Sequence, residues 1–327
     1  MQRIWWGPLL APVVGAAESL ARLRPASLPL ARLAIDLAGE AGDARRVGRI
    51  ARRTLEALAR SPETLARVLQ AAPSAPPRRV MDRDRALEAL AEVQTSLAPH
   101  GLTPFLAFGS LLGAVRGGDF IPGDNDIDLG VIGAAALAAM PAALAGQGVR
   151  FSPLHRVGGR PSKLKIHHPN GVKIDVKAFE PEPDGNTSWD ARSANLVLRK
   201  RFPRHFGLAP MEIRGLTVMV PDCAEAFLEW QYGPGWRVPD PGYHMHTSGP
   251  VHGPEHRAFI HAAGARKLLG EIRLGRARRA LTMARSMAAQ FADEDLWSRL
   301  AAALQAAAAA GPSAPAREGR DAPGPGR

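Results

Sequence analysis

The chain has 327 residues, of which 46% are hydrophobic and 22% are charged. This balance is that of an ordinary globular protein, and it excludes a fully disordered or fibrous chain. Cys223 is the single cysteine, so the chain can form no intrachain disulfide and no cysteine-based zinc site. The length fits one large domain or two smaller ones.

The formal net charge of +11 lies on the two flanks of the chain and not in its middle. Residues 1–80 carry a net charge of +7, residues 81–263 of −1 and residues 264–327 of +5. A nucleic-acid enzyme would more often carry its basic excess around its site, so we expect no nucleic-acid partner. Basic flanks fit peripheral contact with an anionic membrane or with an acidic partner. Arginine-rich helices that face only solvent are the alternative that stays open.

An apolar run at residues 4–17 is too short to cross a bilayer as a helix, which takes about 20 residues. Three interpretations of this run stay open. It is a signal peptide cleaved after the Val-Gly-Ala of residues 14–16, an interfacial anchor led by Trp5 and Trp6, or a helix packed on the body. Later hydrophobic runs are broken by charged residues and do not read as transmembrane.

Residues 31–72 carry apolar side chains at near-helical spacing, with a Gly-Asp turn signal at 42–43 and a break at Pro62. We therefore expect a helical hairpin, followed by a proline-rich linker at 72–77. The predicted division is a helical region with its linker at 1–78, a catalytic domain at 79–263, C-terminal helices at 264–310 and a disordered tail at 311–327.

The segment at 104–116 reads as a short strand that runs into a helix through Gly109 and Ser110. A helix that begins directly after a strand presents free backbone amides, and a glycine there lets an anion approach the backbone closely. Most Gly-Ser pairs are only turns, so this pair indicates a binding site only in combination with the acidic residues at 124–128.

Asp126 and Asp128 belong to the alternating run Asp-Ile-Asp-Leu at 126–129. On a strand, both carboxylates point to one face and both apolar side chains to the other. Two like charges on one face are costly unless a cation lies between them, and Mg²⁺ or Mn²⁺ with oxygen ligands fits that need. An acidic surface turn is the alternative, and the preceding Asp124 and Asn125 fit that description.

A third carboxylate, Asp175, lies in a second alternating segment at 173–177, which comes after a matching segment at 163–167. The Pro-Asn-Gly between them is a hairpin signal. A two-residue loop at 170–171 would mix polar and apolar side chains on each face, whereas a three-residue loop at 169–171 separates them.

The three-residue loop fixes a register for this hairpin. It pairs Lys165 with Asp175, Lys163 with Lys177, and Ile166 with Ile174. Lys163 and Lys165 then lie on the face of Asp175, where they either contact phosphate oxygens or form cross-strand ion pairs. Gly171 would take the left-handed position at the end of the loop.

Taken in order, three segments resemble the LicD family: Gly-Ser-Leu-Leu-Gly-Ala-Val-Arg at 109–116, Phe-Ile-Pro at 120–122 and Asp-Ile-Asp at 126–128. This family includes bacterial phosphocholine transferases and the eukaryotic fukutin and fukutin-related proteins. The resemblance covers about residues 80–240. It implies a nucleotidyltransferase fold of the α/β (α+β) class, with a mixed β-sheet and flanking helices, behind an N-terminal helical region.

The resemblance also implies an enzyme that moves a phospho-alcohol group, phosphocholine or ribitol phosphate, from a CDP-alcohol to a sugar hydroxyl of a glycan or glycolipid. CMP would be released. Asp126, Asp128 and Asp175 would be the catalytic residues and would hold Mg²⁺ or Mn²⁺, with Asp175 as a candidate base. An enzyme of the bacterial type would work in the cytoplasm, where CDP-alcohols are made, at the inner membrane face if it is peripheral.

The donor phosphates would be held by Gly109, Ser110 and Arg116, with Lys163 and Lys165 as further contacts. Two other classes of function stay open. An NTP-using nucleotidyltransferase would use the same turn and carboxylates on a different donor. An inactive glycan-binding relative is supported by Gly123 and Asn125, which stand where the family has tryptophan and aspartate.

Two further clusters are candidates for binding. The histidines between residues 244 and 256 could bind a transition metal, line the acceptor site or form a plain surface loop; they are His244, His246, His252 and His256. The basic run at 199–205 could grip an anionic substrate, and a solvated charge run is its alternative.

Overall fold

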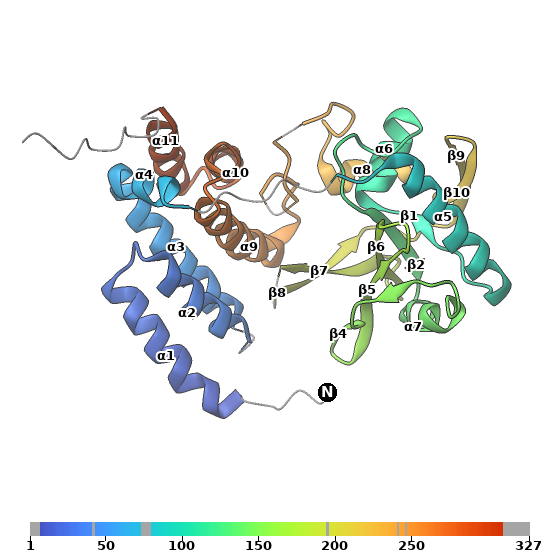
Figure 1. Cartoon of the computed structure of the whole chain (residues 1–327), viewed down its shortest axis with the longest axis horizontal. Coiled ribbons are helices and arrows are strands. Elements are labelled where there is room, and N and C mark those ends of the chain that lie inside the picture. The colour runs from blue at the N-terminus through green and yellow to red at the C-terminus, as the bar shows by residue number, and fades with distance from the viewer. Residues whose placement is uncertain are drawn as a thin grey trace, which may run out of the picture.

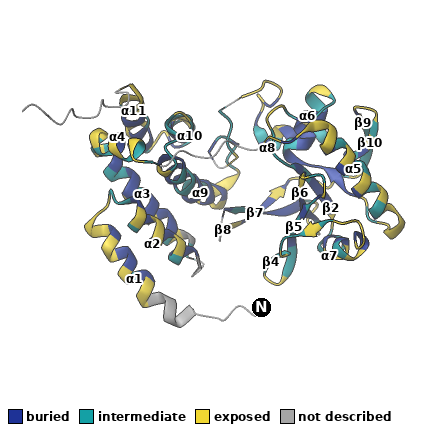
Figure 2. Ribbon diagram, viewed as in Figure 1, coloured by how far each residue is buried: buried dark blue, intermediate teal, exposed yellow. Residues whose placement is uncertain are grey.

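We describe a computed structural model of the chain, in residues 7–40, 43–72, 80–193, 196–240, 242–245 and 247–309. Trp5, Trp6, His246, most of the linker and the tail at 311–327 lie outside the described residues. Figure 1 shows a body built on a β-sheet and a second body made of helices. Each body has its own hydrophobic core, and Figure 2 shows the buried residues gathered where the elements of each body face one another.

The sheet body contains strands of two to nine residues with helices around them. Its strands are β1 (Phe105–Leu106), β2 (Ile127–Ile132), β3 (Arg150–Phe151), β4 (His155–Val157), β5 (Arg160–His167), β6 (Lys173–Pro181), β7 (Thr187–Ser193), β8 (Leu196–Phe202), β9 (Leu208–Ile213) and β10 (Leu216–Pro221). Its helices are α5 (Arg83–Leu97), α6 (Phe108–Gly117), α7 (Ala134–Ala143) and α8 (Ala224–Tyr232), with the 3-10 turn η1 (Ala98–His100).

The strands run in the order β3-β5-β6-β2-β1-β10-β9, with β4 paired to β5. The β7–β8 hairpin continues from the end of β6. β2 and β6 are parallel, as are β1 and β10, while β5 and β6 are antiparallel. The predicted mixed sheet with flanking helices is therefore confirmed.

The hairpin of β5 and β6 has the predicted register. Lys165 pairs with Asp175 and Ile166 with Ile174, and Gly171 has a φ of 92° in the left-handed region. Ile166 and Ile174 are fully buried, so this register keeps their face of the hairpin in the core. A slip of one residue would turn every one of these side chains to the other face, which is why the pattern specifies the pairing.

The helical body is made from both ends of the chain, which the sequence analysis placed in separate regions. Its helices are α1 (Gly7–Leu23), α2 (Leu28–Glu40), α3 (Ala44–Arg60), α4 (Pro62–Gln70), α9 (Gly253–Arg273), α10 (Ala277–Gln290) and α11 (Asp295–Ala309). Leu55 of α3, Met287 of α10 and Trp297 of α11 are fully buried in one core. The predicted boundary at 263/264 falls inside α9.

The breaks expected between the N-terminal helices lie where the sequence indicates. Asp43 caps α3 by accepting a hydrogen bond from the amide of Arg46, and Ser61 caps α4 by accepting one from the amide of Thr64. Pro62 occupies the first position of α4, where its missing N–H costs no hydrogen bond. Polar caps at both sites therefore satisfy amides that no helical carbonyl can reach.

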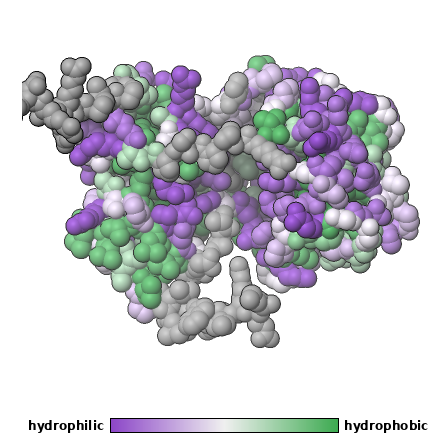
Figure 3. Space-filling view, in the orientation of Figure 1, coloured by the Kyte–Doolittle hydropathy of each residue, from purple (hydrophilic) through white to green (hydrophobic). Residues whose placement is uncertain are grey.

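The apolar N-terminal run contributes to α1, which packs on α2, as the third interpretation of this run expects. Val14, Ala17 and Ala21 are buried in the helical core, whereas Leu20 is 50% exposed. Figure 3 shows the apolar surface over α1 and α2 on the left of the molecule. Among the described helices, none combines the length and the apolar character that crossing a membrane requires.

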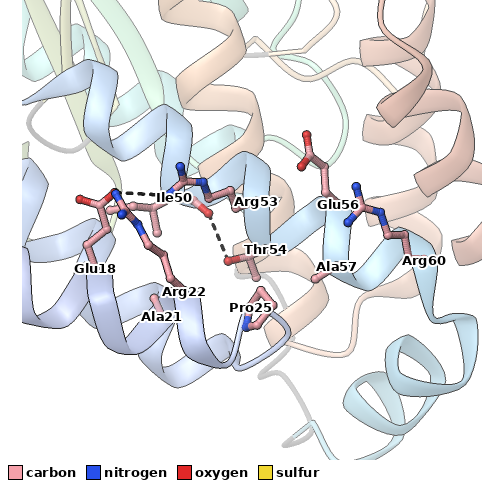
Figure 4. Close-up of a pocket in the computed structure, with 10 residues that line it drawn as sticks. All are labelled: Glu18, Ala21, Arg22, Pro25, Ile50, Arg53, Thr54, Glu56, Ala57 and Arg60. Carbon is pink, nitrogen blue, oxygen red and sulfur yellow. Dashed lines mark hydrogen bonds and ion pairs between the residues drawn. The ribbon is translucent and has the colours of Figure 1, made fainter.

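Glu18 of α1 is a buried carboxylate, only 3% exposed, beside a pocket of about 250 Å³. It accepts hydrogen bonds from Arg22 at 2.9 Å and from Arg46 at 2.5 Å. Figure 4 shows Glu18 and Arg22 facing Arg53 of α3. Burial alone would raise the pKa of Glu18, but these arginines outweigh it, so the pKa lies below its usual value. The cluster joins α1 to α3 by ion pairs from Glu18 to Arg46 and Arg53.

Replacement of this carboxylate by an amide should weaken the helical body. We expect Glu18→Gln to lower the free energy of unfolding by about 1.5–3 kcal/mol at pH 7, the usual contribution of hydrogen bonds to charged groups. Because the folded pKa is depressed, this stabilisation is present above the unfolded pKa and is lost as the pH falls through the folded pKa. Urea unfolding of both proteins between pH 7 and pH 3 measures the difference.

The control for this experiment is Glu63→Gln, at an exposed position of α4. It should leave the free energy of unfolding within about 0.5 kcal/mol of the wild type. A Glu18→Gln variant as stable as the control at pH 7 would show that the cluster adds nothing to the fold.

Candidate active site

The three predicted carboxylates come together on one face of the sheet. Asp128 of β2 is the register partner of Asp175 of β6, and neighbouring strands lie about 4.8 Å apart. Asp126 immediately precedes β2, two residues before Asp128. Burial raises the pKa of Asp128 to about 7, and the charges of Asp126 and Asp175 add to this effect. Burial also raises the pKa of Asp126, with further contributions from Asp175 and Asp124.

Gly109 opens α6 directly beside these carboxylates. Its amide donates a hydrogen bond to Oδ2 of Asp128 at 3.2 Å. A Cβ atom at this position would lie 3.0 Å from Oδ2 of Asp124 and 3.2 Å from Oδ2 of Asp128. The absence of a side chain therefore leaves room for two carboxylates beside the first turn of α6.

Asp124 belongs to this cluster, although the sequence analysis treated it as a surface turn. Its carboxylate lies beside Gly109, and its charge raises the pKa of both Asp126 and Asp128. Alternation with apolar residues could not identify Asp124, since it precedes β2 and comes directly after the turn at Gly123, where φ is 86°.

Ser110, predicted to hold phosphate oxygens, has a backbone partner in the structure. Its Oγ accepts a hydrogen bond of 2.8 Å from the backbone N–H of Asp128, and the residue is only 1% exposed. The hydroxyl keeps its own hydrogen to donate, so its contact with a donor phosphate stays a prediction. Its visible role is to hold the start of β2 against the first turn of α6.

The turn into α6 carries backbone strain at Phe108. Its φ of 45° lies in the left-handed region, which an aromatic residue adopts at a cost of about 1–3 kcal/mol. The ring is held by Phe179 and Trp189, whose centroids lie 5.8 and 5.9 Å away. This aromatic packing stabilises the conformation that aims the amide of Gly109 at Asp128.

Two lysines of β5 offset the negative charge of Asp175. Nζ of Lys163 contacts Oδ2 of Asp175, and Nζ of Lys165 lies 3.3 Å from Oδ1 of the same carboxylate. The cross-strand ion pair, the alternative to a phosphate contact, is therefore present. The Lys165 side chain is 40% exposed, so it can also turn outward.

Lys177 is a site residue to which the sequence analysis gave no role. It lies two residues after Asp175 on β6, and its Nζ is 4.7 Å from the centroid of the Phe108 ring. Burial lowers the pKa of Lys177 to about 8, with a contribution from Lys163, while Asp128 and Asp175 oppose this shift. The sequence pattern could have indicated this role for Lys177, since residues 175 and 177 share one face of a strand.

Arg116, predicted to hold phosphate oxygens, has backbone partners in the structure. Its Nε donates to the carbonyl of Trp236 at 2.6 Å, and Nη2 donates to the carbonyl of Val238 at 3.2 Å. Both carbonyls lie in the segment after α8. Arg116 therefore fastens this segment to the end of α6, and its phosphate contact stays a prediction.

The histidine cluster has an internal structural explanation. The His252 ring stacks on Trp230, with ring centroids 4.0 Å apart. The backbone amide of His252 donates a hydrogen bond to Nδ1 of His256 at 3.0 Å. Burial lowers the pKa of His256 to about 3, with contributions from Lys200 and His252. Throughout the described ranges, no three His, Cys, Asp or Glu side chains are arranged as a ready-made metal site.

Three basic residues of β8 have side-chain partners in the structure. Arg199 donates to Glu182 at 2.7 Å, and Arg201 contacts Asp184. Nζ of Lys200 is buried and donates to Oε1 of Gln231 at 2.9 Å. Arg201, Arg204 and His205 are exposed, so this part of the run fits the solvated alternative, while Arg199 and Lys200 have partners within the protein.

The donor chemistry of the carboxylates fits a divalent cation in part. Asp126 and Asp128 repel each other in a desolvated position, which a cation between them would relieve. Asp175 already contacts Lys163 and Lys165, and its remaining lone pairs leave it as a third candidate ligand. Asp126 and Asp128 are thus the residues that could hold Mg²⁺ or Mn²⁺ with the fewest changes.

Residues 101–223 match the model of the LicD/FKTN/FKRP nucleotidyltransferase domain. This match agrees with the resemblance that the sequence motifs carry. Two curated relatives are the ribitol 5-phosphate transferases FKRP of Homo sapiens and Mus musculus, each 32% identical over 148 residues. The match covers 42% of this chain and 29% of each relative, so the chain spans about three tenths of their length.

Solved structures give weaker likenesses. The lincosamide antibiotic adenylyltransferase LnuA, bound to lincomycin, is 14% identical with a TM-score of 0.33, over 54% of this chain and 94% of its own. ANT(2'')-Ia in complex with adenylyl-2''-tobramycin is 14% identical with a TM-score of 0.31, over 59% and 97%. These scores are too low to argue from.

The close approach at Gly109 predicts the effect of a single methyl group. Gly109→Ala should lower the free energy of unfolding by about 1–3 kcal/mol, because the added Cβ overpacks against Asp124 and Asp128. Gly117→Ala at the end of the same helix meets nothing within 4 Å and should be neutral or stabilising by up to about 1 kcal/mol. Urea unfolding measures both, and equal stabilities would contradict the packing described at Gly109.

Proposed function

We propose that this protein transfers a phospho-alcohol group, of the ribitol phosphate or phosphocholine type, from a CDP-alcohol to a hydroxyl of a glycan or glycolipid, with release of CMP. The observation that carries the proposal is the convergence of Asp126, Asp128 and Asp175 on one face of a LicD-type domain. The two FKRP relatives, named as ribitol 5-phosphate transferases, support a transferase and the ribitol phosphate type.

Phosphoryl transfer depends mostly on positioning and on stabilising charge. Mg²⁺ or Mn²⁺ held by Asp126 and Asp128 would neutralise charge on the donor diphosphate. Gly109 leaves the space in which that group could approach the helix amides. Ser110 fixes the backbone of Asp128 and thereby the direction of its carboxylate.

The acceptor hydroxyl needs a base, and Asp175 is the candidate on the same face. Lys163 and Lys165 lie against its carboxylate and could turn to donor phosphate oxygens when substrate binds. Lys177 stays behind the carboxylates, where its charge offsets theirs. We place this reaction in the cytoplasm, where CDP-alcohols are made, with the glycan acceptor at the inner membrane face.

Ligand-induced thermal stabilisation tests the donor class. CDP-ribitol or CDP-choline with Mg²⁺ should stabilise the wild type by about 2.7 kcal/mol at a hundredfold excess over Kd. The stabilisation should need Mg²⁺ and should disappear in Asp128→Asn, which removes a charge from the metal-binding pair. The matched control is Asp295→Asn, at the exposed start of α11. This variant should keep the Mg²⁺-dependent stabilisation.

The same measurement separates the alternatives. Stabilisation by ATP or UTP in preference to the cytidine diphosphates would indicate an NTP-using nucleotidyltransferase. Stabilisation that is unchanged in Asp128→Asn would contradict the assignment of the carboxylates. If no nucleotide stabilises the wild type, the proposed activity is wrong.

A further inference from the structure

A groove of about 580 Å³ lies between α3, β8 and the first half of α9, away from the carboxylates. It lies where the β7–β8 hairpin reaches from the sheet body to the helical body in Figure 1. Pockets that bind small molecules commonly have volumes of about 300–1,000 Å³. The groove is therefore large enough for a ligand of its own, and the proposed transferase chemistry does not use it.

The floor of the groove is apolar. Leu196, Leu198 and Phe259 are buried at 3%, 8% and 8% exposure, and Val197 beside them is 41% exposed. Gly48 of α3 packs against α9, where its Cβ would lie 3.2 Å from the Cβ of Ala262. Leu196, Leu198 and Phe259 are already removed from water, so a ligand gains from the hydrophobic effect by covering the exposed Val197 and Ala258 of the lining. Such a ligand should carry an apolar part.

The rim of the groove is basic. Arg45 and Arg49 lie one turn apart on α3, both are exposed, and within the described part of the chain neither forms an ion pair. Like charges at this spacing destabilise a helix by a few tenths of a kcal/mol. An anion on the two guanidinium groups would remove that repulsion, and a phosphate suits their paired donors.

The other arginines of the groove are paired, whereas the exposed Glu255 forms no ion pair within the described residues. Arg52 pairs with Glu56 at 2.9 Å and with Glu294 at 2.6 Å, and Arg199 pairs with Glu182 at 2.7 Å. The unbalanced positive charge of the rim is thus concentrated at Arg45 and Arg49, at one side of the apolar floor.

We propose that this groove binds an anionic phospholipid, with its phosphate on Arg45 and Arg49 and an acyl chain on the floor. A sugar phosphate or inorganic phosphate would leave the floor in contact with water. An acidic peptide added to the open edge of β8 is less favoured, because charged side chains such as Arg199 and Arg201 are typical of edges protected from strand addition.

Soluble short-chain lipids test this site on the full-length protein. Dihexanoyl phosphatidylglycerol should bind the wild type at least tenfold more tightly than dihexanoyl phosphatidylcholine or glycerol phosphate in isothermal titration calorimetry. Arg45→Gln/Arg49→Gln should weaken its binding at least tenfold. Val197→Asn, at an exposed position that tolerates substitution, should weaken it at least threefold by making the floor polar.

The matched control is Arg24→Gln/Arg67→Gln, which removes two exposed charges from the same body outside the groove. It should bind phosphatidylglycerol as the wild type does. Equal weakening in both double variants would show a general charge effect and overturn the site.

Glycerol phosphate that binds as tightly as the lipid would indicate a plain phosphate site. Binding of deca-glutamate but not of lipid would assign the groove to a protein partner. Either result overturns the proposal, as does a failure of phosphatidylglycerol to bind the wild type.

Discussion

The parallel pairing of β2 with β6 is the constraint on which the rest of the site depends. It places Asp128 beside Asp175 in a desolvated position, with Asp126 and Asp124 close by. Like charges so arranged are unfavourable by themselves. The protein offsets them with Lys163 on the neighbouring strand and Lys177 on β6 itself, and a divalent cation would offset them further. The lysines and the proposed metal therefore both reduce the repulsion among these carboxylates.

The surrounding structure keeps this costly arrangement in place. Ser110 binds the backbone of Asp128, and the strained turn at Phe108 is held by the rings of Phe179 and Trp189. Arg116 fastens the segment after α8 to the end of α6. These contacts join residues that lie 18 to 120 positions apart in the chain. Strain and desolvation in one place are thus balanced by hydrogen bonds and aromatic packing around it.

Local patterns predicted the parts of the fold that are determined locally. The alternation in β5 and β6 was enough to give the register, because any slip would expose Ile166 and Ile174. The common core of the N- and C-terminal helices could not be predicted, since helical periodicity shows that a face is buried but not which helix covers it. The places of Ser110, Arg116 and Asp124 likewise depend on tertiary contacts that no spacing in the sequence encodes.

A crystal structure with CDP and Mn²⁺, in which anomalous scattering locates the metal, tests the active site most directly. We expect Mn²⁺ at ligand distance from Asp126 and Asp128, with the diphosphate of CDP between the metal and Gly109. A metal bound elsewhere, or a nucleotide away from the first turn of α6, would contradict the claim that the paired carboxylates of β2 and β6 form the active site.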